Sequence, residues 1–213
     1  MPTKERLGVL CSGRGTDLQS IIDAIDRGEV NAEIAVVLTD KPNVMALERA
    51  AKAKIKNLCV NRQEFASRED FERALVRELQ AASVTLVVLA GFMRLLSPYF
   101  VHAYQGRIMN IHPSLLPSFG GAHAHRDVLA YGVKVSGCTV HFVDEGMDRG
   151  PIILQEAVPV WENDTEETLA ARVLEKEHLV YPKAIQLYCE GRLKVEGRQV
   201  RILDFAGGKE NGQ

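Results

Sequence analysis

The most informative stretch of the sequence is residues 109–117, which read Met-Asn-Ile-His-Pro-Ser-Leu-Leu-Pro. Residues 107–112 alternate as in a β-strand, which places Asn110 and His112 on the same face. Pro113 ends the strand because it has no N–H to donate to a neighbour. An amide and an imidazole therefore meet at the carboxyl end of a strand, where ligands bind in open parallel sheets. The alternative interpretation is a pair of satisfied polar residues without a function.

The chain on either side of this stretch predicts strands that alternate with helices. This alternation favours right-handed crossovers and an α/β fold, with a Rossmann-like, doubly wound and mostly parallel sheet. The later segments 135–143 and 151–160 favour an antiparallel hairpin, and residues 193–203 favour a small terminal one. Earlier strands are expected at residues 7–11, 34–39, 58–60 and 85–90, and helices at residues 18–28, 45–53, 70–81 and 126–131, after Ser97 and from Asp164.

Size and composition are those of an ordinary globular protein. The chain has 213 residues, of which 46% are hydrophobic and 25% charged, and its formal net charge is -2. This balance argues against nucleic acid as a partner, and no apolar run approaches the ~20 residues that span a bilayer. The four cysteines are far apart, which favours reduced thiols. We expect a cytoplasmic monomer or homodimer with one domain at 1–203, divided into halves at 1–100 and 101–203, and a disordered tail at 204–213.

A short glycine loop follows the first expected strand. Residues 12–17 read Ser-Gly-Arg-Gly-Thr-Asp and lead directly into a helix, so backbone N–H groups of Gly15, Thr16 and Asp17 can bind an anion together with the helix dipole. Leu18 stands where a dinucleotide fingerprint needs its third glycine, which weakens an NAD interpretation. A single phosphate fits better than a pyrophosphate. A tight turn that binds no ligand is the alternative.

Asp148 follows another expected strand end and is the natural partner of His112. A carboxylate beside an imidazole fixes its orientation, and Asn110 can donate to an oxygen that gains negative charge. An amide, an imidazole and a carboxylate, without a serine elbow, suit direct acyl transfer between two substrates. The alternative for Asp148 is a solvated loop acid. His123 and His125 lack a third ligand at zinc-site spacing, so no metal is expected.

The last long helix carries a carboxylate on its apolar stripe. Asp164 is expected to cap this helix, with Glu167 completing a capping box. Glu177 follows Val173 by four residues, so it lies on the face that packs on the core. A buried carboxylate needs a partner, which leaves two possibilities: ligand hydroxyls, or a buried arginine or lysine.

Two long motifs carry a family resemblance. Residues 110–117 and residues 137–148, which read Gly-Cys-Thr-Val-His-Phe-Val-Asp-Glu-Gly-Met-Asp, are highly specific, and residues 11–18 and 175–182 extend the match over nearly the whole chain. The sequence resembles the phosphoribosylglycinamide formyltransferases, the folate-dependent members of the formyltransferase family in purine biosynthesis. The resemblance implies transfer of a formyl group from 10-formyltetrahydrofolate, as a co-substrate, to the amine of 5'-phosphoribosylglycinamide.

The resemblance also implies roles for individual residues. Asn110, His112 and Asp148 would be catalytic, and Glu177 would bind the ribose hydroxyls. The substrate phosphate would lie at Gly15, Thr16 and Asp17. The folate would contact Arg68, at its glutamate tail, and Met93, Arg94, Leu95, Leu96, Asn110, Asp144 and Asp148.

Three positions depart from the family pattern. Thr16-Asp17 replaces the usual Ser-Asn, which places an acid beside a phosphate. Gly120-Gly121 replaces a more usual Pro-Gly, so the loop at 118–122 is expected to be more mobile. Arg149 replaces a smaller residue, with no predicted effect.

Other functions remain possible on this sequence. A formyltetrahydrofolate deformylase would share the triad but carry a further N-terminal domain, and the first strand here is expected at residue 7. A methionyl-tRNA formyltransferase would need a larger C-terminal domain than the residues after Leu193 provide. A mononucleotide-binding module would use the glycine loop without an Asn-His-Asp group.

Overall fold

The computed structural model describes residues 4–204. The strands are β1 (Glu5–Cys11), β2 (Ala32–Thr39), β3 (Asn57–Cys59), β4 (Leu86–Leu89), β5 (Ile108–His112), β6 (Val135–Phe142), β7 (Ile152–Pro159), β8 (Leu193–Glu196) and β9 (Gln199–Ile202). The helices are α1 (Thr16–Asp26), α2 (Met45–Lys52), α3 (Arg68–Ala81), α4 (Pro98–Ala103), α5 (Ala124–Tyr131) and α6 (Glu166–Cys189), with a 3₁₀ turn, η1, at Arg62–Glu64.

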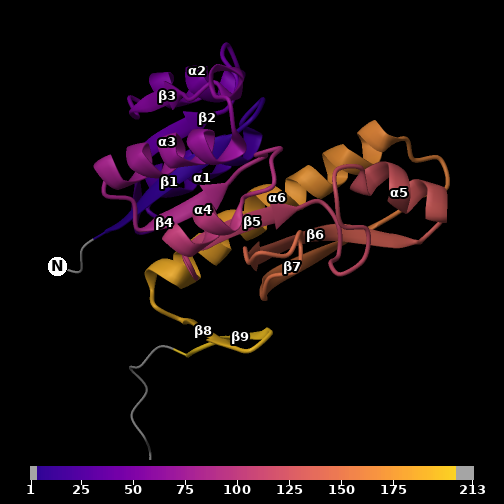
Figure 1. Cartoon of the computed structure of the whole chain (residues 1–213). Coiled ribbons are helices and arrows are strands. Elements are labelled where there is room, and N and C mark those ends of the chain that lie inside the picture. Colours follow the sequence, from indigo (N-terminus) through magenta and orange to yellow (C-terminus); the bar gives the residue numbers. More distant parts are fainter. Residues whose placement is uncertain (1–3, 205–213) are drawn as a thin grey trace, which may run out of the picture.

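All of these strands belong to one sheet, in the order β3-β2-β1-β4-β5-β6-β7-β9-β8 (Figure 1). The first five strands of that order are parallel to one another. β6 runs antiparallel to β5 and β7 antiparallel to β6, while β8 and β9 form a terminal hairpin. The predicted α/β class, the mostly parallel sheet and the two antiparallel hairpins are therefore confirmed.

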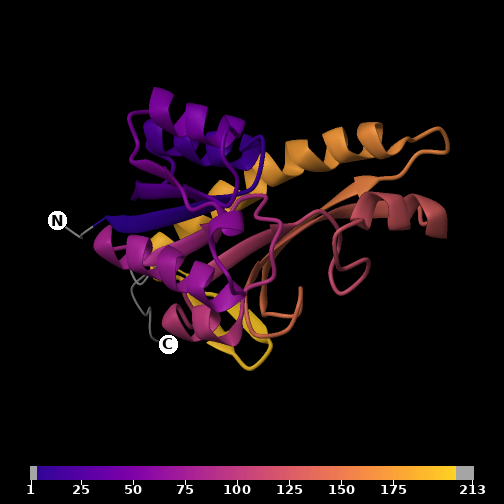
Figure 2. The ribbon, with the colours of Figure 1, turned by 45° about the horizontal axis from the view of Figure 1, so that its top comes forward.

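Helices cover both faces of the sheet. On one face, α1 and α6 bury a large apolar cluster that includes Leu18, Ile21 and Val173. On the other face, α3 and α4 bury a second cluster around Phe71 and Phe100. Figures 1 and 2 show α6 running along the length of the molecule, with the β8–β9 hairpin just beyond its C-terminal end. This long helix therefore connects the parallel part of the sheet with the antiparallel part.

Tyr181 on α6 ties the helix to the centre of the sheet. Its side chain is fully buried, and its hydroxyl lies 3.0 Å from the carbonyl oxygens of both Leu89 in β4 and Met109 in β5. These carbonyls flank the junction from which the catalytic strand β5 continues towards Asn110. The hydroxyl satisfies backbone groups that water cannot reach.

We expect Tyr181→Phe to lower the free energy of unfolding by about 1 to 3 kcal/mol, because it leaves buried carbonyl oxygens without a donor. For a chain of this size, that loss corresponds to a decrease in Tm of roughly 2 to 10 °C. Thermal unfolding followed by circular dichroism measures it. Tyr131→Phe is the matched control, because the Tyr131 side chain is 78% exposed and should give no comparable change. Equal Tm values for the two variants would contradict the role of the Tyr181 hydroxyl.

The predicted start of the last helix is wrong in detail. Thr165, not Asp164, caps α6, and Thr168, not Glu167, completes the capping box. Asp164 instead accepts two hydrogen bonds from the Arg172 guanidinium, at 2.8 and 2.7 Å. These bonds hold the pKa of the Asp164 carboxyl well below its usual range. The Ser97 cap of α4 is confirmed, whereas most of the predicted tail lies outside the described residues.

Candidate active site

The Asn110 side chain is fixed by a histidine on the neighbouring strand. β5 and β6 pair so that Asn110 lies opposite His141, and the Asn110 Nδ2 atom is 3.2 Å from His141 Nε2. His141 Nδ1 lies 2.8 Å from the carbonyl oxygen of Phe142, an acceptor, so Nδ1 carries the proton and Nε2 accepts. Burial lowers the pKa of His141, which keeps its imidazole neutral at pH 7. One N–H of the Asn110 amide is thus held, and the other is free for a ligand oxygen.

The structure brings His112 and Asp148 together, as the sequence predicted. His112 Nδ1 lies 3.6 Å from Asp148 Oδ2, a distance for charge attraction or a bridging water rather than a direct hydrogen bond. His112 Nε2 donates to the carbonyl oxygen of Phe119 at 3.0 Å. His112 is 5% exposed, so its imidazole sits in a site largely protected from solvent.

The loop at residues 118–122 contacts both of these side chains. Besides the Phe119 carbonyl on His112, the backbone N–H of Gly121 donates to Asp148 Oδ2 at 2.9 Å. Phe119 and Asp148 have φ angles of 54° and 53°, in the left-handed region that few L-residues adopt. The loop therefore shapes the site directly, which makes its Gly120-Gly121 departure functionally relevant.

Thr139 supports the turn that follows β5. Its hydroxyl donates to the Ser114 carbonyl oxygen at 2.7 Å and accepts from the Leu116 N–H at 3.0 Å. Gln155 donates to the same hydroxyl and to the Leu116 carbonyl, both at 2.9 Å. These buried bonds fix the chain directly after His112.

The glycine loop forms the expected strand-to-helix junction. Gly15 has a φ of 66°, and a Cβ there would lie 2.9 Å from Ala46, so only glycine fits without strain. α1 begins at Thr16, and its first N–H groups have no partner within the helix. A cavity of about 420 Å³ lies beside this first turn, lined by Thr16, Gln19, Ser20, Asp23, Arg27, Arg49, His178 and Leu179. The geometry suits a small anion at the start of α1.

Asp17 and Glu177 are both buried, with exposed fractions of 8% and 7%. Asp17 points towards α6, where its Oδ1 atom is 3.8 Å from His178 Nε2, and it does not line the cavity. Within residues 4–204, Glu177 forms no ion pair with an arginine or lysine, so that alternative from the sequence is wrong. Burial and the charge of Asp17 raise the pKa of Glu177 to about 8.

Residues 91–97 follow β4 and are held by polar contacts from four elements. The Met93 N–H donates to Ser12 Oγ at 2.9 Å, and Arg94 pairs with buried Asp40 at 2.5 Å. Arg68 donates to the Leu95 carbonyl at 2.5 Å and pairs with Glu72. The Met93 and Leu95 side chains remain 71% and 57% exposed, while Leu96 packs on the α3–α4 side. The segment therefore offers exposed apolar side chains on a fixed backbone.

The loop at residues 144–148 lies next to the catalytic group. Asp144 accepts a hydrogen bond from the Gly146 N–H at 2.9 Å, and Glu145 pairs with His102 at 2.7 Å. Gly150 closes the loop, because a Cβ there would come within 1.7 Å of the Phe142 carbonyl oxygen. The side chain of Met147 is 55% exposed.

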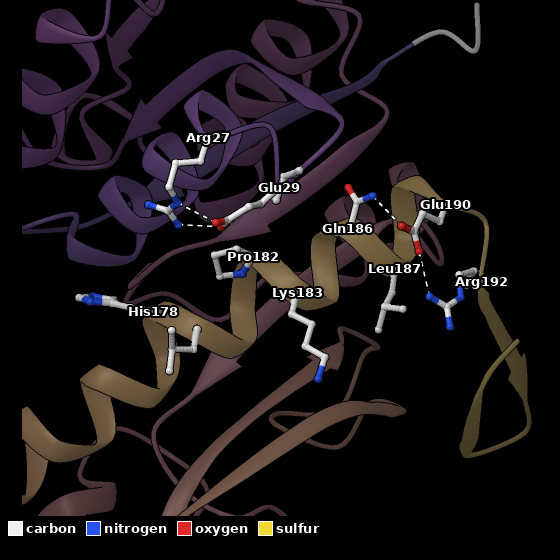
Figure 3. A pocket seen from close by; sticks show the side chains of 11 residues that line it. Arg27, Glu29, His178, Pro182, Lys183, Gln186, Leu187, Glu190 and Arg192 are labelled. Atoms are coloured by element: carbon white, nitrogen blue, oxygen red, sulfur yellow. Dashed lines mark hydrogen bonds and ion pairs between the residues drawn. The ribbon is translucent and has the colours of Figure 1, made fainter. Parts of the chain in front are cut away.

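A second cavity, of about 330 Å³, lies on the outer side of α6 (Figure 3). Its Arg27 pairs with Glu29 and its Arg192 pairs with Glu190, so these charges already neutralise each other. Its lining includes none of the predicted site residues. The described part of the chain also contains no group of three or more potential metal ligands. We therefore assign the chemistry to the Asn110 region and not to this cavity.

Sequence reasoning missed His141 and the Phe119 carbonyl as parts of the site. His141 alternates with Thr139 along β6, which was a usable signal, but only the register of β5 and β6 shows that it faces Asn110. The position of Phe119 depends on loop dihedral angles, for which the sequence has no periodic signal. No helix in residues 4–204 is long and apolar enough to cross a membrane.

The chain was compared with protein families and known structures. The Formyl transferase family model matches residues 5–185. The phosphoribosylglycinamide formyltransferase of Escherichia coli strain K12 is 45% identical over 88% of this chain and 88% of its own length. The crystal structure of glycinamide ribonucleotide transformylase 1 from Symbiobacterium toebii has a TM-score of 0.93 and 52% identity, covering 94% of this chain and 95% of that one.

Longer relatives also match. The trifunctional purine biosynthetic protein adenosine-3 of Chironomus tentans is 46% identical over 92% of this chain. This chain spans only 14% of the length of that protein. The family match nevertheless covers most of the chain and includes the strand, loop and helix segments that form the site described above. The chain belongs to the formyl transferase family.

Proposed function

We propose that this protein transfers a formyl group from 10-formyltetrahydrofolate to the amine of 5'-phosphoribosylglycinamide. The observation that carries this proposal is the arrangement of Asn110, His112 and Asp148 at the carboxyl end of β5. The anion site at the start of α1 and the exposed apolar segment 91–97 lie at the carboxyl ends of β1 and β4, the same edge of the sheet. Two substrates can therefore approach the Asn110 amide from two sides.

The side chains suggest how the reaction proceeds. The amine attacks the formyl carbon, and negative charge develops on the formyl oxygen. The free N–H of Asn110 can donate to that oxygen, and a protonated His112 can stabilise the same charge. Asp148, across 3.6 Å from His112, can help carry the proton from the amine to the leaving nitrogen through a water.

The folate side of the site is proposed from the chemistry of its residues. A pterin ring is flat and polar at its edge, and residues 91–97 offer backbone groups together with the exposed Met93 and Leu95 side chains. Arg94 is engaged with Asp40, so we assign it to fixing the segment rather than to direct contact with the ring. Arg68 is 48% exposed at its side chain and can still meet a carboxylate tail. Asp144 and Asp148 close the opposite side.

An acceptor-dependence assay tests the proposal. Release of tetrahydrofolate should require 5'-phosphoribosylglycinamide and should be matched by an equal amount of formylated product. Release without the acceptor, with formate as the product, would indicate a formyltetrahydrofolate deformylase. No release under either condition would favour a mononucleotide-binding module. We further propose small-molecule substrates only, a cytoplasmic location and a monomer or homodimer.

A further inference from the structure

Two buried carboxyl groups meet where α1 and α6 pack together. Asp17 lies in the first turn of α1, and Glu177 lies on the inner side of α6. The Asp17 Oδ1 atom is fully buried and accepts no hydrogen bond from any residue that the structure describes. Its nearest basic atom is His178 Nε2 at 3.8 Å, which is also buried and has no hydrogen-bond partner. Such an orphaned pair of groups is rare in folded proteins and needs an explanation.

The groups that face this pair are neutral at pH 7. Burial and the nearby Arg49 of α2 lower the pKa of His178, so its imidazole does not balance the Asp17 charge. Burial raises the pKa of the Cys11 thiol in β1 and of the Tyr181 hydroxyl in α6. Burial also raises the pKa of Cys138 in β6 to about 12. No cation within residues 4–204 forms an ion pair with either carboxylate, apart from the weak His178 contact.

Two negative charges cannot both be buried here without a compensating partner. Burial raises the pKa of Asp17 to about 6, and burial together with the Asp17 charge raises that of Glu177 to about 8. These titrations belong to the pair rather than to either residue alone. Near pH 7 the pair therefore holds one proton.

We propose that Asp17 and Glu177 share this proton at the base of the substrate site, and that a sugar phosphate bound at the first turn of α1 keeps it in place. Asp17 is a positioning residue here: it sets the protonation of Glu177, which faces the ribose in the function proposed above, on which this inference rests. A phosphate carries a charge of about −1.5 to −2 near pH 7, which opposes ionisation of the neighbouring pair. The acid beside the phosphate is thus tolerated because it is not left fully charged.

The sign of the pH dependence follows from this linkage. The free protein loses the shared proton as pH rises through about 8, whereas the complex loses it at a higher pH. The affinity for a sugar phosphate must therefore fall as pH rises above about 8. The second ionisation of a phosphate, near pH 6, is already complete in that range and does not contribute.

The test measures the Kd of 5'-phosphoribosylglycinamide by calorimetry at pH 7, 8 and 9. The wild-type Kd should increase between pH 8 and 9 by a factor that approaches ten per unit, the limit for one linked proton. Asp17→Asn keeps the shape of the side chain but removes one charge, so its Kd should change less and should be about three- to tenfold lower than the wild-type value at pH 9. Asp26→Asn, an exposed change at the far end of α1, is the control and should follow the wild type.

Proton uptake and carboxyl titration make the test decisive. At pH 8, calorimetry in buffers of different ionisation enthalpy should show proton uptake on binding by the wild type and less by Asp17→Asn. In the free wild type, carbon NMR should detect a carboxyl group that titrates near pH 8, and Asp17→Asn should lower that value. Equal pH slopes and equal carboxyl titrations in both proteins would overturn the inference. If the wild type does not bind the ribonucleotide, the proposed function fails, while the titration of the free protein still decides whether the pair shares a proton.

Discussion

Asn110→Ala is expected to lower kcat for formyl transfer by about 100- to 1000-fold, the usual effect of removing one donor to a developing oxyanion. The reason is geometric: His141 Nε2 holds one Asn110 N–H at 3.2 Å, which aims the second N–H at the ligand. Because this interaction strengthens only as charge develops, KM for either substrate should change by much less than kcat. Steady-state kinetics with both substrates varied measures this difference.

His141 provides a second arm of the same experiment. His141→Ala leaves the Asn110 amide in place but frees its orientation, so kcat should fall by less than in Asn110→Ala. The double variant should lose no more activity than Asn110→Ala alone, because the two side chains act through one hydrogen bond. Asn31→Ala, an exposed change far along the chain from this site, is the control. Near-normal turnover by Asn110→Ala would remove the amide from the reaction.

The sequence was sufficient for the part of this site that depends on strand periodicity. The two-residue period of β5 places Asn110 and His112 on one face whatever the rest of the fold does. The apolar segments and glycine loop likewise predicted the order of strands and helices, which the structure confirms. Local periodicity survives in the folded protein because each of these segments buries its apolar side chains against the core.

Contacts between distant residues were not predictable in the same way. Asp164 has the chemistry of a helix cap, but Arg172 competes for both of its oxygens, and Thr165 takes the cap position. The pairing of Asn110 with His141 depends on the register between two strands, which no local pattern sets. The unusual φ of Phe119 places its carbonyl on His112 through loop geometry alone. Register, competition and loop dihedral angles are properties of the assembled chain.

Asp148→Asn is expected to lower kcat by about 100-fold or more, within the range for loss of a group that assists proton transfer. The substitution is chosen because it changes the charge and leaves the shape. An asparagine side chain oxygen can still accept the 2.9 Å hydrogen bond from the Gly121 N–H, so the loop at 118–122 should keep its position. The carboxylate 3.6 Å from His112 Nδ1 would be lost, and with it the stabilisation of a protonated imidazole.

This design separates chemistry from loop structure. If Asp148 acts on the proton, Asp148→Asn and Asp148→Ala should both lose kcat, whereas KM for the folate substrate should increase clearly only in the alanine variant, which also releases Gly121. Asp127→Asn, an exposed change on α5, is the control for loss of one negative charge near the site. Full activity in Asp148→Asn with a loss only in Asp148→Ala would show that Asp148 holds the loop rather than moving a proton. In that case the loop contact, and not the contact with His112, would be the reason for a carboxylate at this position.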